Sequence, residues 1–155
     1  MRDEVTFRLA SESDIPWITS VVPRLHEFGP PRWRDTIVME RAQLGDVSRT
    51  IAEGPQRGLV LIAESEGMRH GFVHVKYLVD AMTDELTLHV AHVIVSHNWE
   101  SRGVARTLLS AAEDFGRQRG CRLATLNVFL DNTRARALYE RFGYQRESMR
   151  LVKPL

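Results

Sequence analysis

Alternating and periodic apolar positions divide the first part of the chain into one strand and two helices. The alternation in VTFRLA, from Val5, predicts a strand. The segment after it predicts a helix with Ser13 or Asp14 as the N-cap and Pro16 in its first turn. A second helix is expected from Arg34 to Leu44.

Three apolar runs in the middle of the chain predict neighbouring strands. GLVLIAES (residues 58–65) and HGFVHVKYLVD (residues 70–80) flank a turn at Gly67 and predict a hairpin. ELTLHVAHVIV, from Glu85, predicts a third strand beside them.

Helical and strand patterns then alternate to the end of the chain. A helix is expected from Gly103 to about Arg119, because its apolar residues fall three and four positions apart. A strand over residues 122–130, a helix from Thr133 to Phe142 and a final strand over residues 144–152 follow. This order predicts an α/β domain whose central sheet carries helices on both faces.

Composition is that of an ordinary globular protein with one domain, residues 1–155. Hydrophobic residues make up 43% and charged residues 26% of the chain. Its apolar runs are too short to span a bilayer, so no membrane association is expected. Because the N-terminus lacks the apolar core of a secretion signal, a cytoplasmic location is expected. Cys121 is the only cysteine, which excludes an internal disulfide.

Basic residues are concentrated in the last third of the chain. Residues 1–100 contain 10 Lys and Arg against 15 Asp and Glu, whereas residues 101–155 contain 11 against 5. This imbalance favours a polyanionic ligand near the C-terminal third, and a solvated arginine face explains it equally well.

The turn from Glu100 to Val104 lies where a strand gives way to a helix. The first backbone N–H groups of a helix have no partner within it, and with the helix dipole they form a seat for phosphate. Gly103 permits close approach of a ligand, and Arg102 and Arg106 add positive charge. A plain strand-to-helix connection is an equally good interpretation of this segment alone. Neither G-x-x-x-x-G-K-[ST] nor G-x-G-x-x-G occurs, so nothing indicates a nucleoside triphosphatase or a dinucleotide fold.

Two spaced motifs stand out in the second half of the chain. Glu100, Gly103 and Ala105 fall on the pattern R/Q-x-x-G-x-G/A, with Glu at its first position. The pattern L-x-V-x-x-x-N-x-x-A-x-x-x-Y-x-x-x-G-F/Y is matched at every fixed position, by Leu126, Val128, Asn132, Ala135, Tyr139, Gly143 and Tyr144. These motifs resemble the coenzyme loop and the later signature of the GCN5-related N-acetyltransferase (GNAT) family. The resemblance implies a mixed, mostly antiparallel sheet whose fourth and fifth strands splay apart.

The resemblance also implies how a coenzyme is bound. Acetyl-CoA, or a longer acyl-CoA, is expected as co-substrate between the splayed strands. The backbone of Val93, Ile94 and Val95 would pair with the pantetheine arm, and an N–H near Val95 would polarise the thioester carbonyl. Asn132 would bind the pantetheine, and a helix cap is its alternative role. The pyrophosphate would lie on the N–H groups of Ser101, Arg102, Gly103, Val104, Ala105 and Arg106.

Position 100 departs from the family pattern, because Glu stands where Arg or Gln is usual. A carboxylate near a diphosphate is repulsive unless it points away or pairs with Arg102. Coenzyme affinity is the property that this departure puts in question.

By the same resemblance, the acyl group passes by direct attack of a primary amine in a ternary complex. His89 is expected as the base that takes the ammonium proton, and a structural histidine is its alternative. Glu85, His74 or water are other candidates for the base. Asn127, another base position of the family, cannot usefully accept a proton. Tyr139 is expected to protonate the departing thiolate, with core packing as its alternative.

No metal ion is predicted, because strand alternation would send His89 and His92 to opposite faces of the sheet. The same alternation would place His89, Ala91, Val93 and Val95 on one face.

The acceptor is expected to be an amine of a small molecule, peptide or protein. The segment from His26 to Arg34, with Phe28 and Trp33, is a candidate acceptor pocket. A catalytically silent acyl-CoA sensor is an alternative function.

A nucleic-acid binder is the least favoured function, since no recognition motif is present. It would use Arg102, Arg106, Arg134, Arg136 and Arg141. Family members are often dimers, so a homodimer is left open.

Overall fold

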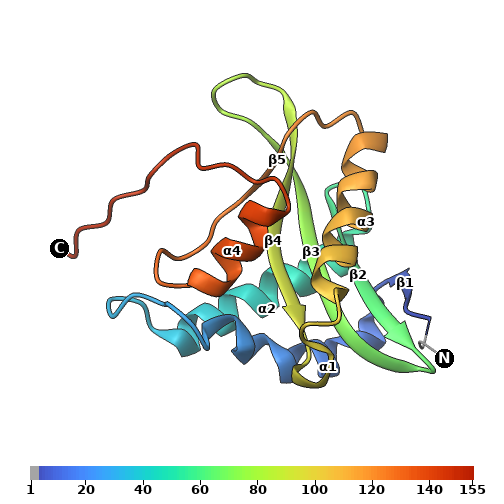
Figure 1. The fold of residues 1–155 in the computed structure, drawn as a ribbon. Coiled ribbons are helices and arrows are strands. Elements are labelled where there is room, and N and C mark those ends of the chain that lie inside the picture. The colour runs from blue at the N-terminus through green and yellow to red at the C-terminus, as the bar shows by residue number, and fades with distance from the viewer. Residues whose placement is uncertain (1–3) are drawn as a thin grey trace.

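The computed structural model describes residues 4–155 and is built around one five-stranded sheet (Figure 1). Its strands are β1 (Thr6–Leu9), β2 (Gly58–Ser65), β3 (Met68–Val79), β4 (Leu86–Val95) and β5 (Ala124–Leu126). They lie side by side in chain order. The pairs from β1 to β4 are antiparallel, and β5 is parallel to β4. The predicted mixed, mostly antiparallel sheet is confirmed.

Helices cover both faces of the sheet, as predicted (Figure 1). The α-helices are α1 (Ile15–Val21), α2 (Thr36–Glu53), α3 (Val104–Gln118) and α4 (Thr133–Arg141). Three short 3-10 helices connect them: η1 (Glu12–Asp14), η2 (Val22–His26) and η3 (His97–Trp99). Helices α1 and α2 lie on one face, and α3 and α4 lie on the other.

The sheet separates two hydrophobic cores. Leu88 and Val90 of β4 pack with Leu108, Leu109 and Ala112 of α3 on what we call the α3 face. On the opposite α2 face, Phe72 and Ile94 pack against Ile18 of α1 and Val47 of α2. All of these side chains are buried. At about 25 cal/mol per Å² of apolar surface removed from water, these two cores supply the main driving force for folding.

Strand β4 is paired along its whole length on one side but only briefly on the other. Its pairing with β3 continues to Val95, whereas its pairing with β5 covers Leu88, His89 and Val90 alone. The chain leaves β5 after Leu126. Beyond Val90 the two strands are therefore apart, which agrees with the splay that the family resemblance implied.

A β-bulge at Ala91 changes which face each β4 side chain occupies. His92 pairs with His74 and Val90 pairs with Val75, so Ala91 has no partner on β3. The extra residue breaks the simple alternation. Residues opposite each other in an antiparallel pair share a face. His89, opposite Lys76, and His92, opposite His74, therefore both lie on the α2 face.

The expectation that His89, Ala91, Val93 and Val95 share one face is thus wrong. Val93 and Val95 pack on the α3 face, whereas His89 lies on the α2 face. The geometric reason for excluding a metal at the histidines is also wrong, because it assumed uninterrupted alternation. A bulge adds one residue to a strand and leaves no clear mark in the hydrophobic pattern.

The first helix begins where its sequence indicated. Asp14 is the N-cap of α1 and Pro16 lies in the first turn. The Asp14 carboxylate is fully buried and accepts two hydrogen bonds from Arg8, one from Arg69 and one from the backbone N–H of Ser11. These partners, Arg8 above all, hold the pKa of Asp14 well below its usual range. This network ties β1 and β3 to the start of the first helix.

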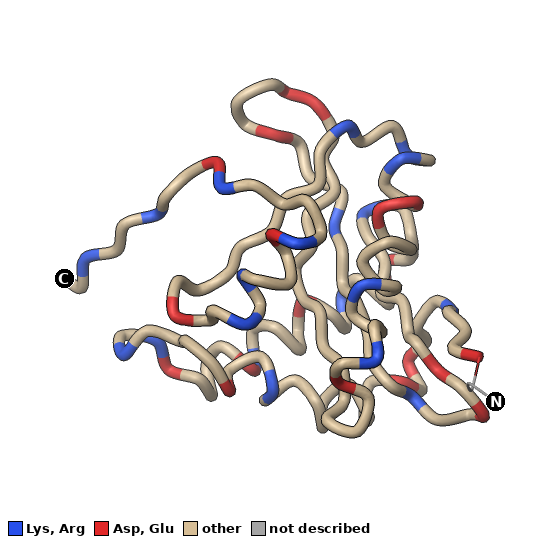
Figure 2. The backbone as a smooth tube through the Cα atoms, in the orientation of Figure 1, with Lys and Arg blue, Asp and Glu red and all other residues tan. Residues whose placement is uncertain are grey.

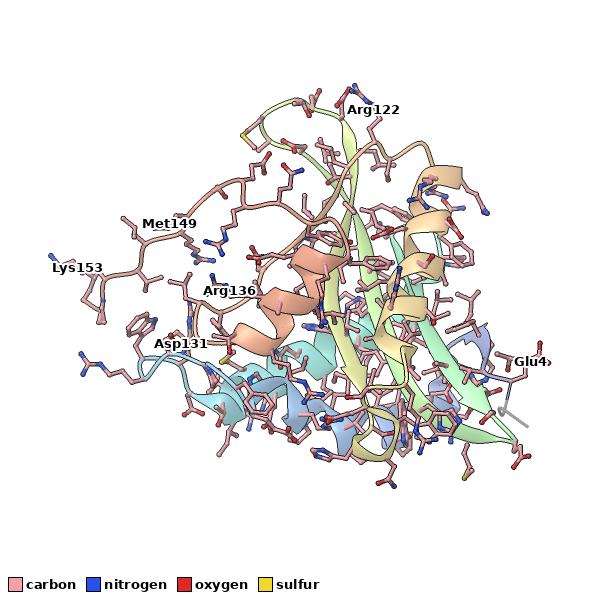
Figure 3. All side chains as sticks on the ribbon, in the orientation of Figure 1. Glu4, Arg122, Asp131, Arg136, Met149 and Lys153 are labelled. Carbon is pink, nitrogen blue, oxygen red and sulfur yellow. The ribbon has the colours of Figure 1, made fainter. Side chains whose placement is uncertain are left out.

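Three element boundaries differ from prediction. Helix α2 continues from Leu44 through Gly45 to Glu53, because Val47 and Ile51 pack on the sheet and outweigh the low helix propensity of glycine. Strand β5 covers three of the nine residues expected. The strand predicted over residues 144–152 does not form, because the tail leaves the sheet without pairing with the outer edge of β5. Figure 1 shows it projecting from the domain, and Figure 3 places Met149 and Lys153 along it.

Among residues 4–155, none of the helices combines the length and the apolar character that crossing a lipid bilayer requires.

Two glycines of α2 give a matched test of this account. Gly45 lies inside the helix and an added Cβ would meet nothing within 4 Å, so Gly45→Ala should raise the free energy of unfolding by about 1 kcal/mol. Gly54, at the C-cap with a φ of 79°, is equally uncrowded, and Gly54→Ala should lower it by roughly 1–3 kcal/mol. Urea denaturation measures both. Changes of the same sign would contradict the assignment of the helix end.

Candidate active site

The N-terminus of α3 presents free backbone donors. Gly103 precedes the helix with a φ of 81° and supplies no side-chain cap, and Ser101 also has a positive φ, of 60°. The N–H groups of the first helical turn therefore have no acceptor within the helix. Together with the positive end of a 15-residue helix dipole, they form a site suited to an anion.

Two arginines of this segment rest on aromatic rings. The guanidinium of Arg102 lies 4.8 Å from the ring centroid of Trp99, and that of Arg106 lies 5.8 Å from the ring of Phe142. Trp99 is in turn stacked on His70 at 3.5 Å. Each cation–π contact contributes about 0.5–1 kcal/mol at an exposed position and holds positive charge beside the loop.

Glu100 is paired with arginines from two other elements. It contacts Arg24 of η2 and, at 3.1 Å, Arg134 of α4. Arg24 above all holds the pKa of Glu100 below its usual range, so the carboxylate stays ionised. Arg102, which the sequence offered as a partner for Glu100, instead lies over the ring of Trp99. Figure 2 shows the basic positions that surround the start of α3 and α4. The negative charge of Glu100 is thus neutralised locally.

Next to this loop, β4 has an open edge. Val93, Ile94 and Val95 pair with Val73, Phe72 and Gly71 of β3, but β5 has already ended at Leu126. Val93 and Val95 contribute to the α3-side core and Ile94 to the α2-side core, so all three side chains are used for packing. The backbone of this segment is what remains for a ligand.

Asn132 is the N-cap of α4, and its Oδ1 accepts a hydrogen bond from the N–H of Ala135 at 3.2 Å. The loop between η2 and α2 lies against this turn, near Asp131 (Figure 3). Gly29 of that loop comes so close that an added Cβ would lie 2.8 Å from the backbone N of Asn132. The predicted acceptor segment is therefore positioned beside the start of α4.

Tyr139 packs against the α3-side core from α4. Its ring meets that of Tyr144 edge to face, with centroids 5.9 Å apart. Burial raises the pKa of Tyr139, so its phenol keeps its proton at neutral pH. Tyr139 and His89 approach β4 from opposite faces.

His89 lies on the α2 face, opposite Thr125 of β5. Its Nδ1 is 3.0 Å from the Thr125 hydroxyl. Burial, with a smaller contribution from Lys76, lowers the pKa of His89, so the imidazole is neutral at pH 7 and can accept a proton. It lies at the last stretch where β4 and β5 are still paired.

The other proposed bases lie in different surroundings. His74 is fully buried and its Nε2 is 2.8 Å from the Thr50 hydroxyl. Glu85 lies at the far end of β4, in an ion pair with Arg122 that Figure 3 places beside the β3–β4 loop. Asn127 follows β5 and is exposed.

The sequence pattern did not reveal a polar cluster on the α2 face. Asp46 and Thr50 of α2 lie close to His74 and Lys76 of β3 and to His92 of β4. Burial lowers the pKa of His74 to about 3 and that of His92 to about 4. His74, His89 and His92 were the available signal, but their common face depends on the bulge.

Comparison with known proteins gives the same fold. Residues 22–144 match the acetyltransferase (GNAT) family. An uncharacterized N-acetyltransferase, YhfO, of Bacillus subtilis strain 168 is 30% identical over 90 residues, an alignment that covers 58% of this chain and 60% of that relative. The chain thus matches less than two thirds of the relative's length.

Two solved structures have the same architecture over nearly the whole chain. Aminoglycoside N-acetyltransferase AAC(6')-Iy in complex with CoA superimposes with a TM-score of 0.77 at 17% identity, covering 98% of this chain and 95% of that one. A ribosomal-protein-alanine N-acetyltransferase from Brucella melitensis biovar Abortus 2308 gives a TM-score of 0.72 at 20% identity, covering 98% and 100%. With the family match over residues 22–144, these findings show that the chain belongs to the acetyltransferase (GNAT) family.

Proposed function

We propose that this protein is an N-acyltransferase that moves an acetyl group from acetyl-CoA to a primary amine. One observation carries the proposal: the unpaired edge of β4 leads directly to an uncapped helix N-terminus flanked by arginines. An extended arm that ends in a diphosphate fits this arrangement, because the arm can pair as a strand and the diphosphate can accept helix N–H bonds.

The coenzyme is proposed to bind through backbone groups of two segments. Val93, Ile94 and Val95 would hold the pantetheine, with Asn132 beside it, and the N–H groups from Ser101 to Arg106 would hold the diphosphate. Arg24 supports this site, since its Nη1 is buried and has no hydrogen-bond partner among the described residues. Its unsatisfied donors are available to an anion beside Glu100.

Transfer is proposed as a direct attack in a ternary complex. The amine nitrogen bonds to the thioester carbon while the C–S bond breaks, with a backbone N–H near Val95 polarising the carbonyl. His89 takes the ammonium proton before attack, and Tyr139 gives its phenolic proton to the departing thiolate. The second proton, which the nitrogen loses as the amide forms, restores the Tyr139 phenol. The step as proposed uses no metal ion, because backbone dipoles and these two side chains supply the required charge and protons.

The need for a base follows from the acceptor's acidity. An alkylammonium with a pKa near 10.4 is only about 0.04% neutral at pH 7, whereas an α-amine with a pKa near 7.8 is roughly 14% neutral. His89 therefore assists an alkylamine far more than an α-amine.

The acceptor is proposed to be an amine of a small molecule or peptide. Two of the structural neighbours act, by their names, on an aminoglycoside and on a ribosomal-protein alanine. Phe28 and Trp33 are about half exposed on the loop beside α4 and would line the acceptor pocket. A cytoplasmic location, a homodimer and the absence of a nucleic-acid partner stay predictions.

Removing one helix N–H tests the coenzyme site. Ala105 is the second residue of α3, and α1 of the same chain already carries proline at its second residue, so Ala105→Pro should leave the helix intact. Loss of one charge-assisted hydrogen bond, worth about 1.5–3 kcal/mol, should weaken binding of coenzyme A roughly 10- to 100-fold in calorimetry. Ala105→Ser keeps the N–H and is the control. Equal affinity in the two variants would refute the assigned donors.

Two substitutions test the proton transfers. His89→Ala and Tyr139→Phe should each lower kcat for an alkylamine roughly 100-fold or more while coenzyme affinity changes little. In the unaltered protein, kcat/KM should fall when the pH drops through the pKa of His89, which burial sets below 6.5. This acidic limb should vanish in His89→Ala.

Steady-state assays with acetyl-CoA across an amine panel measure both effects. Full activity in both variants would overturn the catalytic assignment and leave the binding site standing. Coenzyme binding without turnover of any amine in the unaltered protein would favour an acyl-CoA sensor.

A further inference from the structure

The polar cluster on the α2 face has the donor set of a metal site. Asp46, His74 and His92 offer one carboxylate oxygen and two imidazole nitrogens that all lie within 4.8 Å of one another. We propose that these three residues bind one divalent transition-metal ion, Zn²⁺ being the natural case, and that the bound ion inhibits acyl transfer. The nitrogen and oxygen ligands are those that zinc prefers.

The ligands come from three rigid elements. Asp46 is on α2, His74 on β3 and His92 on β4, and the bulge at Ala91 is what turns His92 toward the other two. His74 and His92 are paired across the strands, and their ring centroids are 5.4 Å apart. Ligands on regular elements hold their geometry better than ligands on loops.

The hydrogen bonds of Thr50 are compatible with a metal-binding tautomer of His74. In the proposed site the Thr50 hydroxyl donates to the carbonyl of Asp46, 3.1 Å away, and accepts from His74 Nε2, 2.8 Å away. In that arrangement His74 carries its proton on Nε2 and a free lone pair on Nδ1. That Nδ1 is buried and has no hydrogen-bond partner among the described residues. An imidazole whose other nitrogen donates to an oxygen is the usual arrangement of a metal ligand.

Metal binding requires the three ligands to move closer together, at a cluster that borders an open groove. Tetrahedral Zn²⁺ ligands at about 2.0–2.1 Å from the ion lie roughly 3.4 Å apart, so separations of up to 4.8 Å must shrink by at most about 1.4 Å. Asp46 can supply this movement, because its side chain is on a helix surface and about a quarter exposed. A groove of about 430 Å³, lined by Asp46, Thr50 and Lys76 among others, borders the cluster at Asp46, and neither histidine is among its lining residues.

Lys76 is the competitor for the site. Its Nζ lies 2.5 Å from Oδ2 of Asp46, whereas Oδ1 is paired with Arg49, which is 67% exposed, at 3.8 Å. The second oxygen is thus available to an ion. The ammonium of Lys76 repels a divalent cation. The affinity for the metal ion should therefore be lower than it would be if Lys76 were absent.

Inhibition, unlike binding, rests on the proposed function. His89 lies on the same face as the cluster and is paired with Lys76. It is two residues before the bulge at Ala91. An ion at the cluster adds two positive charges on the face where His89 has to take up an ammonium proton. Both charges oppose the approach of a cationic acceptor and the protonation of His89.

Calorimetric titration of metal-free protein with Zn²⁺, in the absence of acetyl-CoA, tests binding on its own. One ion per chain is expected. His92→Gln and Asp46→Asn should weaken binding by more than the roughly 10- to 100-fold that loss of an outer-shell partner costs, and Thr50→Val should cost about that much. Lys76→Met should tighten binding about tenfold or more, because it removes a neighbouring charge.

His97→Gln is the matched control, since His97 is an exposed histidine that contacts Glu27 outside the cluster. A Co²⁺ titration gives a second signal, because three protein ligands and one water produce a tetrahedral absorption band. Absence of stoichiometric binding in both the unaltered protein and Lys76→Met overturns the proposal. So does binding that His97→Gln abolishes and His92→Gln spares. Zn²⁺ binding with no effect on turnover removes only the inhibitory role.

Discussion

The unequal pairing of β4 is the constraint on which the rest of the structure depends. One edge is satisfied by β3 up to Val95, and the other is satisfied by β5 only through Val90. Buried backbone N–H and C=O groups need partners, so an edge left open inside a domain is costly unless something else fills it. The open edge, the turn at Gly103 and the cap of α4 at Asn132 lie around the same gap. The proposed coenzyme site is a direct consequence of that gap.

Most of the fold was predictable because periodicity records burial. The strands at residues 58–65 and 85–95 and the helix after Gly103 bury one face or both, so their apolar positions mark them. Failures occurred where the local pattern and the tertiary contacts disagree. Gly45 lies within a helix that packing maintains, and the segment after Tyr144 does not pair with the outer edge of β5. A strand requires a partner, and a partner cannot be inferred from local pattern.

The backbone groups of the candidate site could be predicted from the sequence, whereas the side chains that surround them were harder to predict. The N-terminus of α3 follows from an apolar run, a glycine and a second apolar run, which are local features. The partners of Glu100 are not local, because Arg24 and Arg134 come from elements 76 and 34 residues away. The faces of the β4 histidines depend on a single unpaired residue, Ala91. Small irregularities in a strand thus decide which chemical groups meet, although they barely alter the hydrophobic pattern.

The separation of the two cores by the sheet has a consequence for how such proteins diverge. Helices α1 and α2 pack against one set of strand side chains, and α3 and α4 pack against the other. Substitutions within one core therefore act mainly on the packing of that core, whereas contacts such as that of Gly29 with the start of α4 join the two layers. Under the proposed function, changes in the loop before α2 would alter acceptor preference while the opposite core keeps its packing. Overlap of backbones at 17–20% identity is the expected record of such change.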